Sequence, residues 1–122
     1  MTDKRHALGR MGEDMAADHL VGKGMKILER RVRCRHGEID LVARDGREWV
    51  FIEVKTRSSS RMGTAVEALT PKKIGRFTSA VVEYVSRHGL EREPIRCDMV
   101  AIDAQSDGGF AIVHYPASIP MQ

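Results

Sequence analysis

Two strand-like runs joined by one tight turn constrain the fold of this chain more than any other sequence feature. The runs Glu38–Arg44 and Glu48–Thr56 are rich in aliphatic residues, and Asp45-Gly46 between them is a signal for a hairpin turn. A connection this short cannot cross over a sheet, so the two runs must pair as antiparallel neighbours. Together with a third run at Met25–Arg33, they predict an antiparallel meander.

Helices are predicted on both sides of this meander. Apolar residues at helical spacing predict a first helix over 7–23, which ends at Gly24. A second helix has Thr70 as its N-cap and Pro71 at its first position, and it ends at Gly89. Two final strands are predicted at Ile95–Asp103 and Phe110–Tyr115. The order αβββαββ is typical of an α/β fold with a mixed sheet flanked by helices.

Length and composition are those of one globular domain. The 122 residues are enough for a single core, and 42% of them are hydrophobic and 30% charged, unlike the composition of a disordered chain. No uncharged apolar run approaches the ~20 residues that a membrane-spanning helix needs, and the first residues lead into no apolar signal segment. We therefore expect one domain over 1–122, with a short irregular tail from residue 116, in the cytoplasm.

Positive charge is concentrated in the middle of the chain. Residues 30–76 hold twelve Lys and Arg against six Asp and Glu, whereas the rest holds eight against eleven. This asymmetry suggests a face for a polyanion, with nucleic acid favoured over a membrane because no basic amphipathic helix carries the charge. The alternative is a solvated surface without a partner. The candidates for phosphate contact are Arg57, Arg61, Lys72, Lys73 and Arg76.

Charged residues interrupt the second strand of the hairpin at a defined spacing. Alternate side chains of a strand share a face, so Glu53 and Lys55 lie on one side. A hairpin loop of two or four residues places Asp40 on that same face, and a loop of three or five places it on the opposite face. The pair Asp45-Gly46 favours two or four. We therefore expect Asp40, Glu53 and Lys55 to converge.

Such a group is costly in an aliphatic strand, because desolvating charges costs more than pairing them returns. Two clustered carboxylates repel each other unless a hard cation lies between them, and Mg²⁺ prefers oxygen ligands. In phosphodiester hydrolysis the metal lowers the pKa of a bound water, and a nearby ammonium orients that water. Glu13 lies in line with the apolar face of the first helix, and it is either a further acid of this site or a solvated residue. The pattern favours a Mg²⁺ (or Mn²⁺) site over a chance triplet.

Five motifs occur together between Gly12 and Ile102: Gly12-Glu13, Gly37-Glu38-Ile39-Asp40-Leu41, Phe51-Ile52-Glu53-Val54-Lys55-Thr56-Arg57, Lys73, and Arg96-Cys97-Asp98-Met99-Val100. Together they resemble the YraN-like family of small bacterial endonuclease-like proteins. That family has the restriction-endonuclease-like PD-(D/E)XK fold and is similar to archaeal Holliday-junction resolvases. In this chain Ile39 replaces the proline of the superfamily name, which has no ligand role.

The resemblance implies a Mg²⁺-dependent DNA endonuclease. Asp40, Glu53 and Lys55 match its catalytic motif, and Glu13 matches the helix-borne acid of the resolvase branch. In this interpretation Glu13, Asp40 and Glu53 hold the metal, and Lys55 positions the attacking water. Whether the DNA is branched or damaged stays open, because one fold hosts many activities.

A second class of function is also open. A nucleic-acid-binding module or an adaptor could keep the fold and the basic middle segment without cutting, although the intact Asp40, Glu53 and Lys55 favour catalysis. DNA is the expected partner, without a membrane, and the residues leave open whether the chain forms a homodimer. No nucleotide cofactor is expected, because Gly9 and Gly12 form no phosphate-binding run after a strand.

Two further groups have structural interpretations. Cys34, Cys97 and His114 are residue types that can bind zinc. Their spacing in the sequence is not that of a zinc site, so zinc is not expected. Arg96 and Asp98 alternate on one strand, where they either pair with each other or brace the site.

Overall fold

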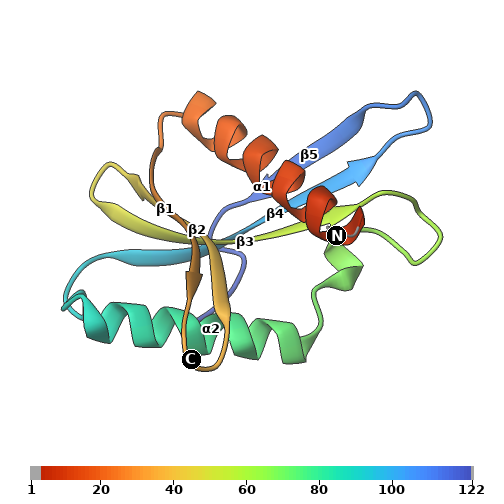
Figure 1. The fold of residues 1–122 in the computed structure, drawn as a ribbon. Helices are drawn as coiled ribbons and strands as arrows, with labels where there is room; N and C mark the ends of the chain where they lie inside the picture. The colour runs from red at the N-terminus through yellow and green to blue at the C-terminus, as the bar shows by residue number, and fades with distance from the viewer. Residues whose placement is uncertain (1–3, 122) are drawn as a thin grey trace.

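The computed structural model describes residues 4–121, with side chains from residue 6 (Figure 1). Its elements in chain order are α1 (Lys4–Gly22), β1 (Lys26–Arg33), β2 (Glu38–Asp45), β3 (Glu48–Arg57), the short 3-10 helix η1 (Val66–Ala68), α2 (Pro71–Arg87), β4 (Ile95–Ala104) and β5 (Phe110–Tyr115). The predicted order αβββαββ is confirmed, and each strand boundary lies within one residue of its predicted position.

The five strands form one mixed sheet in the order β1-β2-β3-β4-β5. Only β3 and β4 are parallel, and the segment that connects them contains α2. Figure 1 shows α1 above the sheet and α2 below it. This arrangement confirms the predicted α/β fold and is consistent with a nuclease-like fold.

Side-chain alternation divides the core into two layers. Phe51 on β3 and Met99 on β4 pack with Phe77 of α2 on one face of the sheet. Ile52 and Val100 pack with buried residues of α1 on the other face. Burying both faces of the central strands explains the continuous apolar runs Trp49–Ile52 in β3 and Met99–Ile102 in β4.

The first helix differs from its predicted range at both ends. It begins at Lys4 instead of residue 7 and ends at Gly22 instead of residue 23. The residues before 7 are polar, so the apolar spacing could not detect them, but lysine and arginine are good helix formers. At the other end, the backbone N–H groups of Lys23 and Met25 both donate to the carbonyl of Leu20, which turns the chain into β1.

The central hairpin has the predicted register. Asp45 pairs with Glu48, so the loop contains two residues, and the regular pairs continue to Leu41 opposite Ile52. The same register, continued by one residue, sets Asp40 opposite Glu53. Beyond this point β2 pairs with β1 alone.

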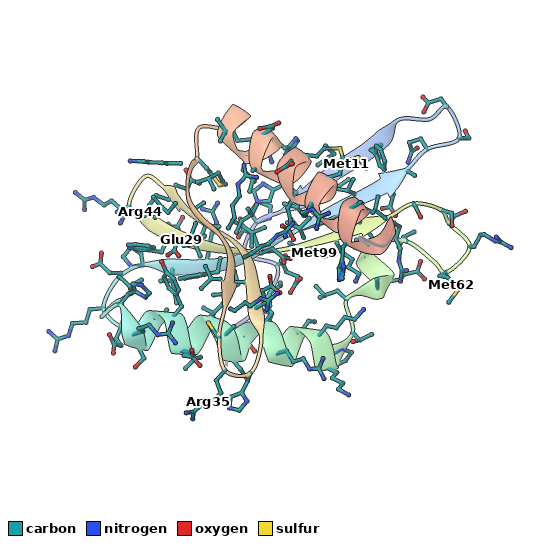
Figure 2. All side chains as sticks on the ribbon, viewed as in Figure 1. Met11, Glu29, Arg35, Arg44, Met62 and Met99 are labelled. Carbon is teal, nitrogen blue, oxygen red and sulfur yellow. The ribbon has the colours of Figure 1, made fainter. Side chains whose placement is uncertain are left out.

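Glycine at two positions allows the helices to pack closely against the sheet. A Cβ atom on Gly12 of α1 would lie 1.9 Å from Oγ1 of Thr56 on β3. A Cβ atom on Gly37, in the β1–β2 turn, would lie 2.2 Å from the backbone oxygen of Arg76 on α2. Figure 2 shows Arg35 of the same turn beside α2. Glycine at these positions therefore sets how closely the helices approach the sheet.

The helices within residues 4–121 lack the combination of length and hydropathy that crossing a membrane requires.

Candidate functional site

A cleft of about 420 Å³ opens between the sheet and the first half of α2. The residues that line it are Arg33, Cys34, Gly37, Glu38, Asp40, Glu53, Lys55, Leu69, Lys73, Arg76 and Phe77. The structure thus brings together the three residues that the hairpin register predicts, Asp40, Glu53 and Lys55. Arg33 and Glu38 were not predicted as site residues. The alternation of Glu38 with Asp40, and the pairing of Arg33 with Glu38, are the signals that could have found them.

Asp40 is anchored where β2 separates from β3. Its Oδ2 atom accepts a hydrogen bond of 2.7 Å from the backbone N–H of Val54. The carboxylate therefore satisfies a backbone donor of β3 just past the last regular pair, Leu41 and Ile52. This contact holds the Asp40 side chain against β3 at the wall of the cleft.

Glu53 hydrogen-bonds to Asp40, and the two acids behave as one unit. Burial raises the pKa of Glu53, and the negative charge of Asp40 raises it further. Burial also raises the pKa of Asp40, whereas the hydrogen bonds from Glu53 and from Val54 N–H oppose this rise. Glu53 is therefore the protonated partner and Asp40 the acceptor when no cation is present.

Lys55 lies beside this pair with a second ammonium next to it. Burial lowers the pKa of Lys55, and the positive charge of Lys73 lowers it further. Lys73 is positioned by the start of α2, where the Thr70 hydroxyl accepts a hydrogen bond of 3.3 Å from the Lys73 backbone N–H. The predicted N-cap thus places a cation at the cleft.

Glu13 is near this group but does not join the cleft. Its Oε1 atom accepts a hydrogen bond of 2.7 Å from Nε of Arg31, and its negative charge contributes to the raised pKa of Asp40. Glu13 lines a neighbouring hollow that shares Lys55 with the cleft. Among residues 6–121, no three His, Cys, Asp or Glu side chains are close enough to hold a metal ion. The expected three-carboxylate set is therefore not assembled, because the Arg31 guanidinium holds Glu13; its role as a ligand stays a prediction.

The predicted phosphate-contact residues fall into three groups. Lys73 and Arg76 line the cleft, and Arg57 lines the neighbouring hollow. Arg61 and Lys72 are exposed and line neither space.

Arg96 and Asp98 form a separate network on the other face of the sheet. Arg96 Nε lies 3.1 Å from Asp98, so the predicted pairing is confirmed. Asp98 also accepts hydrogen bonds of 2.7 Å from His114 Nε2 and 2.8 Å from the Ala117 backbone N–H. Neither residue lines the cleft. The His114 side chain thus hydrogen-bonds to Asp98. Cys34 and Cys97 are free thiols.

The cleft residues fit Mg²⁺ by their chemistry. Asp40 and Glu53 are half-buried carboxyl groups that hydrogen-bond to each other. The ion pairs of residues 6–121 include neither of them. Mg²⁺ is usually held in proteins by one or two carboxylates and several waters. These two side chains would supply the carboxylates.

Comparison with known proteins identifies relatives of similar length. Residues 12–102 match the model of the uncharacterised protein family UPF0102. A UPF0102 protein of a Nocardioides species is 47% identical over 110 residues, covering 90% of this chain and 89% of that protein. The UPF0102 protein of Frankia casuarinae is 42% identical over 110 residues, covering 90% and 93%. That of Shewanella woodyi is 42% identical over 108 residues, covering 85% and 92%.

UPF0102 is the YraN-like family that the sequence motifs resemble, so this prediction is confirmed. The names of these relatives state no activity. With a family match over most of its length and relatives at this identity, the chain belongs to the UPF0102 family.

Proposed function

We propose that this protein is a Mg²⁺-dependent endonuclease that hydrolyses phosphodiester bonds in DNA. The observation that carries this proposal is the hydrogen-bonded Asp40–Glu53 pair in the wall of a cleft that also contains Lys55. An acid pair that only stabilised the fold would be expected to form a salt bridge, since unpaired buried charge is costly, and the ion pairs of residues 6–121 include neither acid. A function in which a cation enters the cleft accounts for that cost.

Asp40 and Glu53 would hold the metal. When bound, Mg²⁺ (or Mn²⁺) supplies a Lewis acid that neutralises phosphate charge and lowers the pKa of water. The anchored Asp40 presents its carboxylate from one side, because the Val54 N–H fixes its orientation. Glu53 gives up its proton to a solvent base before it can act as a ligand, and its raised pKa makes this step dependent on pH.

Lys55 would position the attacking water. Because its pKa is lowered, a larger fraction of Lys55 is the neutral amine at a given pH than in an exposed lysine. The three cations Arg33, Lys73 and Arg76 line the same cleft and would neutralise the phosphates on either side of the reacting bond. The cleft therefore combines acids for the metal with cations for the DNA.

The experiment is a cleavage assay on branched, nicked and duplex DNA with Mg²⁺, with Mn²⁺ and with a chelator. We expect cleavage of at least one DNA structure in the presence of metal, and none with the chelator or with Glu53→Gln. Cleavage that persists at the same rate in Glu53→Gln would come from a contaminant and would contradict the proposal.

A DNA-binding protein without nuclease activity is the second candidate. The observation that favours it is the pairing of Glu13 with Arg31, which keeps Glu13 out of the cleft, so that no three acids of residues 6–121 are close enough to hold a metal ion. Salt-dependent DNA binding without cleavage of any substrate would support this candidate over the nuclease.

A further inference from the structure

A second hollow lies on the other side of Lys55, between α1 and the end of β3. It has a volume of about 330 Å³. Residues of α1, including Gly9 and Glu13, form one wall, and β3 residues up to Arg57 form the floor. The loop after β3 closes the far side with Ser58, Ser59 and Met62, and Figure 2 shows Met62 on this loop.

Arg57 is the residue in this hollow that most clearly lacks a partner. Its Nε atom is buried and has no hydrogen-bond partner among residues 6–121. The ion pairs of this part of the chain do not include Arg57. A buried donor on a charged group costs free energy when it is left unsatisfied, so such a group indicates an acceptor that the isolated chain lacks.

The chemistry of the lining favours an anion with several acceptor oxygens. Arg57 and Lys55, two residues apart on β3, both line the hollow and supply its positive charge. Glu13 is the one acid among the lining residues, and it is already paired with Arg31 at 2.7 Å. The hydroxyl groups of Ser58 and Ser59 add neutral donors at the rim. A phosphate group matches this set of donors, because guanidinium groups bind phosphate through two parallel hydrogen bonds.

We propose that this hollow is a second phosphate subsite, in which Arg57 holds the phosphate next to the one at Asp40 and Glu53 on the same DNA strand. Lys55 lines both spaces, so one strand passing Lys55 would place neighbouring phosphates in the cleft and in the hollow. This inference rests on the proposed function for the identity of the strand. The presence of a phosphate subsite in the hollow does not depend on cleavage.

The first test measures DNA binding in a chelator, so that no cleavage occurs. Single phosphodiesters of a fluorescent oligonucleotide are replaced in turn by uncharged methylphosphonates, and affinity is measured by anisotropy. For the wild type we expect one linkage whose replacement weakens binding about tenfold to a hundredfold, the range of one charge-assisted hydrogen bond. In Arg57→Gln the loss at that linkage should disappear, whereas Arg61→Gln, at an exposed arginine that lines neither space, should retain it.

An identical methylphosphonate profile in wild type and Arg57→Gln would overturn the proposal. Thermal unfolding of Arg57→Gln serves as the folding control, and Arg57→Lys, which keeps the charge but lacks the Nε–H donor, should give an intermediate profile.

The second test uses inorganic phosphate and the NMR signal of the Arg57 Nε–H group. We expect a saturable shift of this signal in the wild type and in Asp40→Asn, with a smaller shift at Arg61. No greater shift at Arg57 than at Arg61 would exclude a phosphate site in the hollow. If the wild type binds no DNA at all, the proposed function fails, while this titration still decides the subsite.

Discussion

The sheet carries two groups of acids, and they are held in opposite ways. Asp98 on β4 is 0% exposed, and its oxygens accept hydrogen bonds from Arg96, His114 and the Ala117 backbone. Asp40 and Glu53 are half-buried, face an open cleft and bond chiefly to each other. The fully enclosed acid is thus saturated with donors, whereas neither member of the partly enclosed pair takes part in the ion pairs of residues 6–121.

This difference separates a structural acid from a candidate catalytic one. The network of Asp98 ties β4 to β5 and to the chain after it, because His114 belongs to β5 and Ala117 follows that strand. The pair in the cleft ties β2 to β3 through the Val54 N–H and through the bond between the two acids, and it faces the open cleft. A buried charge that has all its partners stabilises a fold, while a carboxyl pair that faces an open cleft is suited to bind a ligand.

The largest expected effect is the loss of cleavage in Asp40→Asn and Glu53→Gln. Each change keeps the shape of the side chain but removes the charge that holds the metal. Cleavage should fall to background, while thermal stability stays unchanged or rises, because an amide can keep the hydrogen bond between the two side chains without a buried charge. DNA affinity measured in a chelator should be kept or increased. A parallel loss of stability and affinity in these variants would mean that the acid pair has the structural role assigned to Asp98.

The next largest effect is expected for Lys55→Ala. Removal of a group that positions and deprotonates water should lower the rate of cleavage by ~10²–10⁴-fold. Binding of Mn²⁺, measured by calorimetry, should change little, because lysine is not a metal ligand. Loss of Mn²⁺ binding in Lys55→Ala would contradict the division of roles between the acids and Lys55.

Asp98→Ala should mainly reduce stability. The change leaves His114, Arg96 and the Ala117 N–H without their common acceptor, and breaking a buried pair typically costs ~3–5 kcal/mol. Urea unfolding measures this loss. Asp14→Ala, which removes an exposed acid paired with Arg30, should cost less than about 1 kcal/mol. Equal costs for the two variants would show that the Asp98 network does not hold the fold together.

The pH dependence of stability should differ between wild type and Glu53→Gln. The folded pKa values of Asp40 and Glu53 are raised, so the pair stabilises the fold when protonated and loses this contribution as pH rises. Without metal, the free energy of unfolding of the wild type should therefore fall between about pH 4, near the ordinary carboxyl pKa, and about pH 10, the raised pKa of Glu53, and that of Glu53→Gln should fall less. Saturating Mg²⁺ should reduce the fall in the wild type, because it stabilises the charged pair. Parallel curves for the two proteins would argue against a shared proton.

The smallest effect is expected for Lys73→Ala. Removing one phosphate contact should reduce the slope of log affinity against log salt concentration by about one. Lys72→Ala is the matched control, since Lys72 neighbours Lys73 but does not line the cleft. An equal change of slope in both variants would place the DNA on the outer surface of α2 instead of in the cleft.

Much of the candidate site could be predicted because it depends on local geometry. The Asp45-Gly46 turn gives a two-residue loop, and strand alternation then determines that Asp40 and Glu53 share a face. The Thr70 cap and Pro71 were likewise sufficient to locate α2 and, with it, Lys73. These features need only short-range hydrogen bonding and sterics, which the neighbouring residues specify.

The partners of Glu13 and Arg57 could not be predicted in this way. Glu13 meets Arg31, which lies 18 residues away on β1 and has a positive φ of 52°, a backbone state that no local signal indicated. Arg57 lies in a hollow whose walls come from α1 and from the loop after β3. Both outcomes depend on how closely α1 approaches β3, which is set by the contact of Gly12 with Thr56.

The sequence by itself determined the hairpin register, the second helix and the convergence of Asp40, Glu53 and Lys55, because each follows from turn length and residue spacing. Only the tertiary structure decided that Asp98 is saturated with donors while Asp40 and Glu53 take no part in the ion pairs of residues 6–121. The donors of Asp98 lie as far as 19 residues along the chain, and they meet it only after β4 and β5 have paired. The physical reason is that burial and ion pairing depend on which distant segments pack together, and residue spacing within one element does not contain that information.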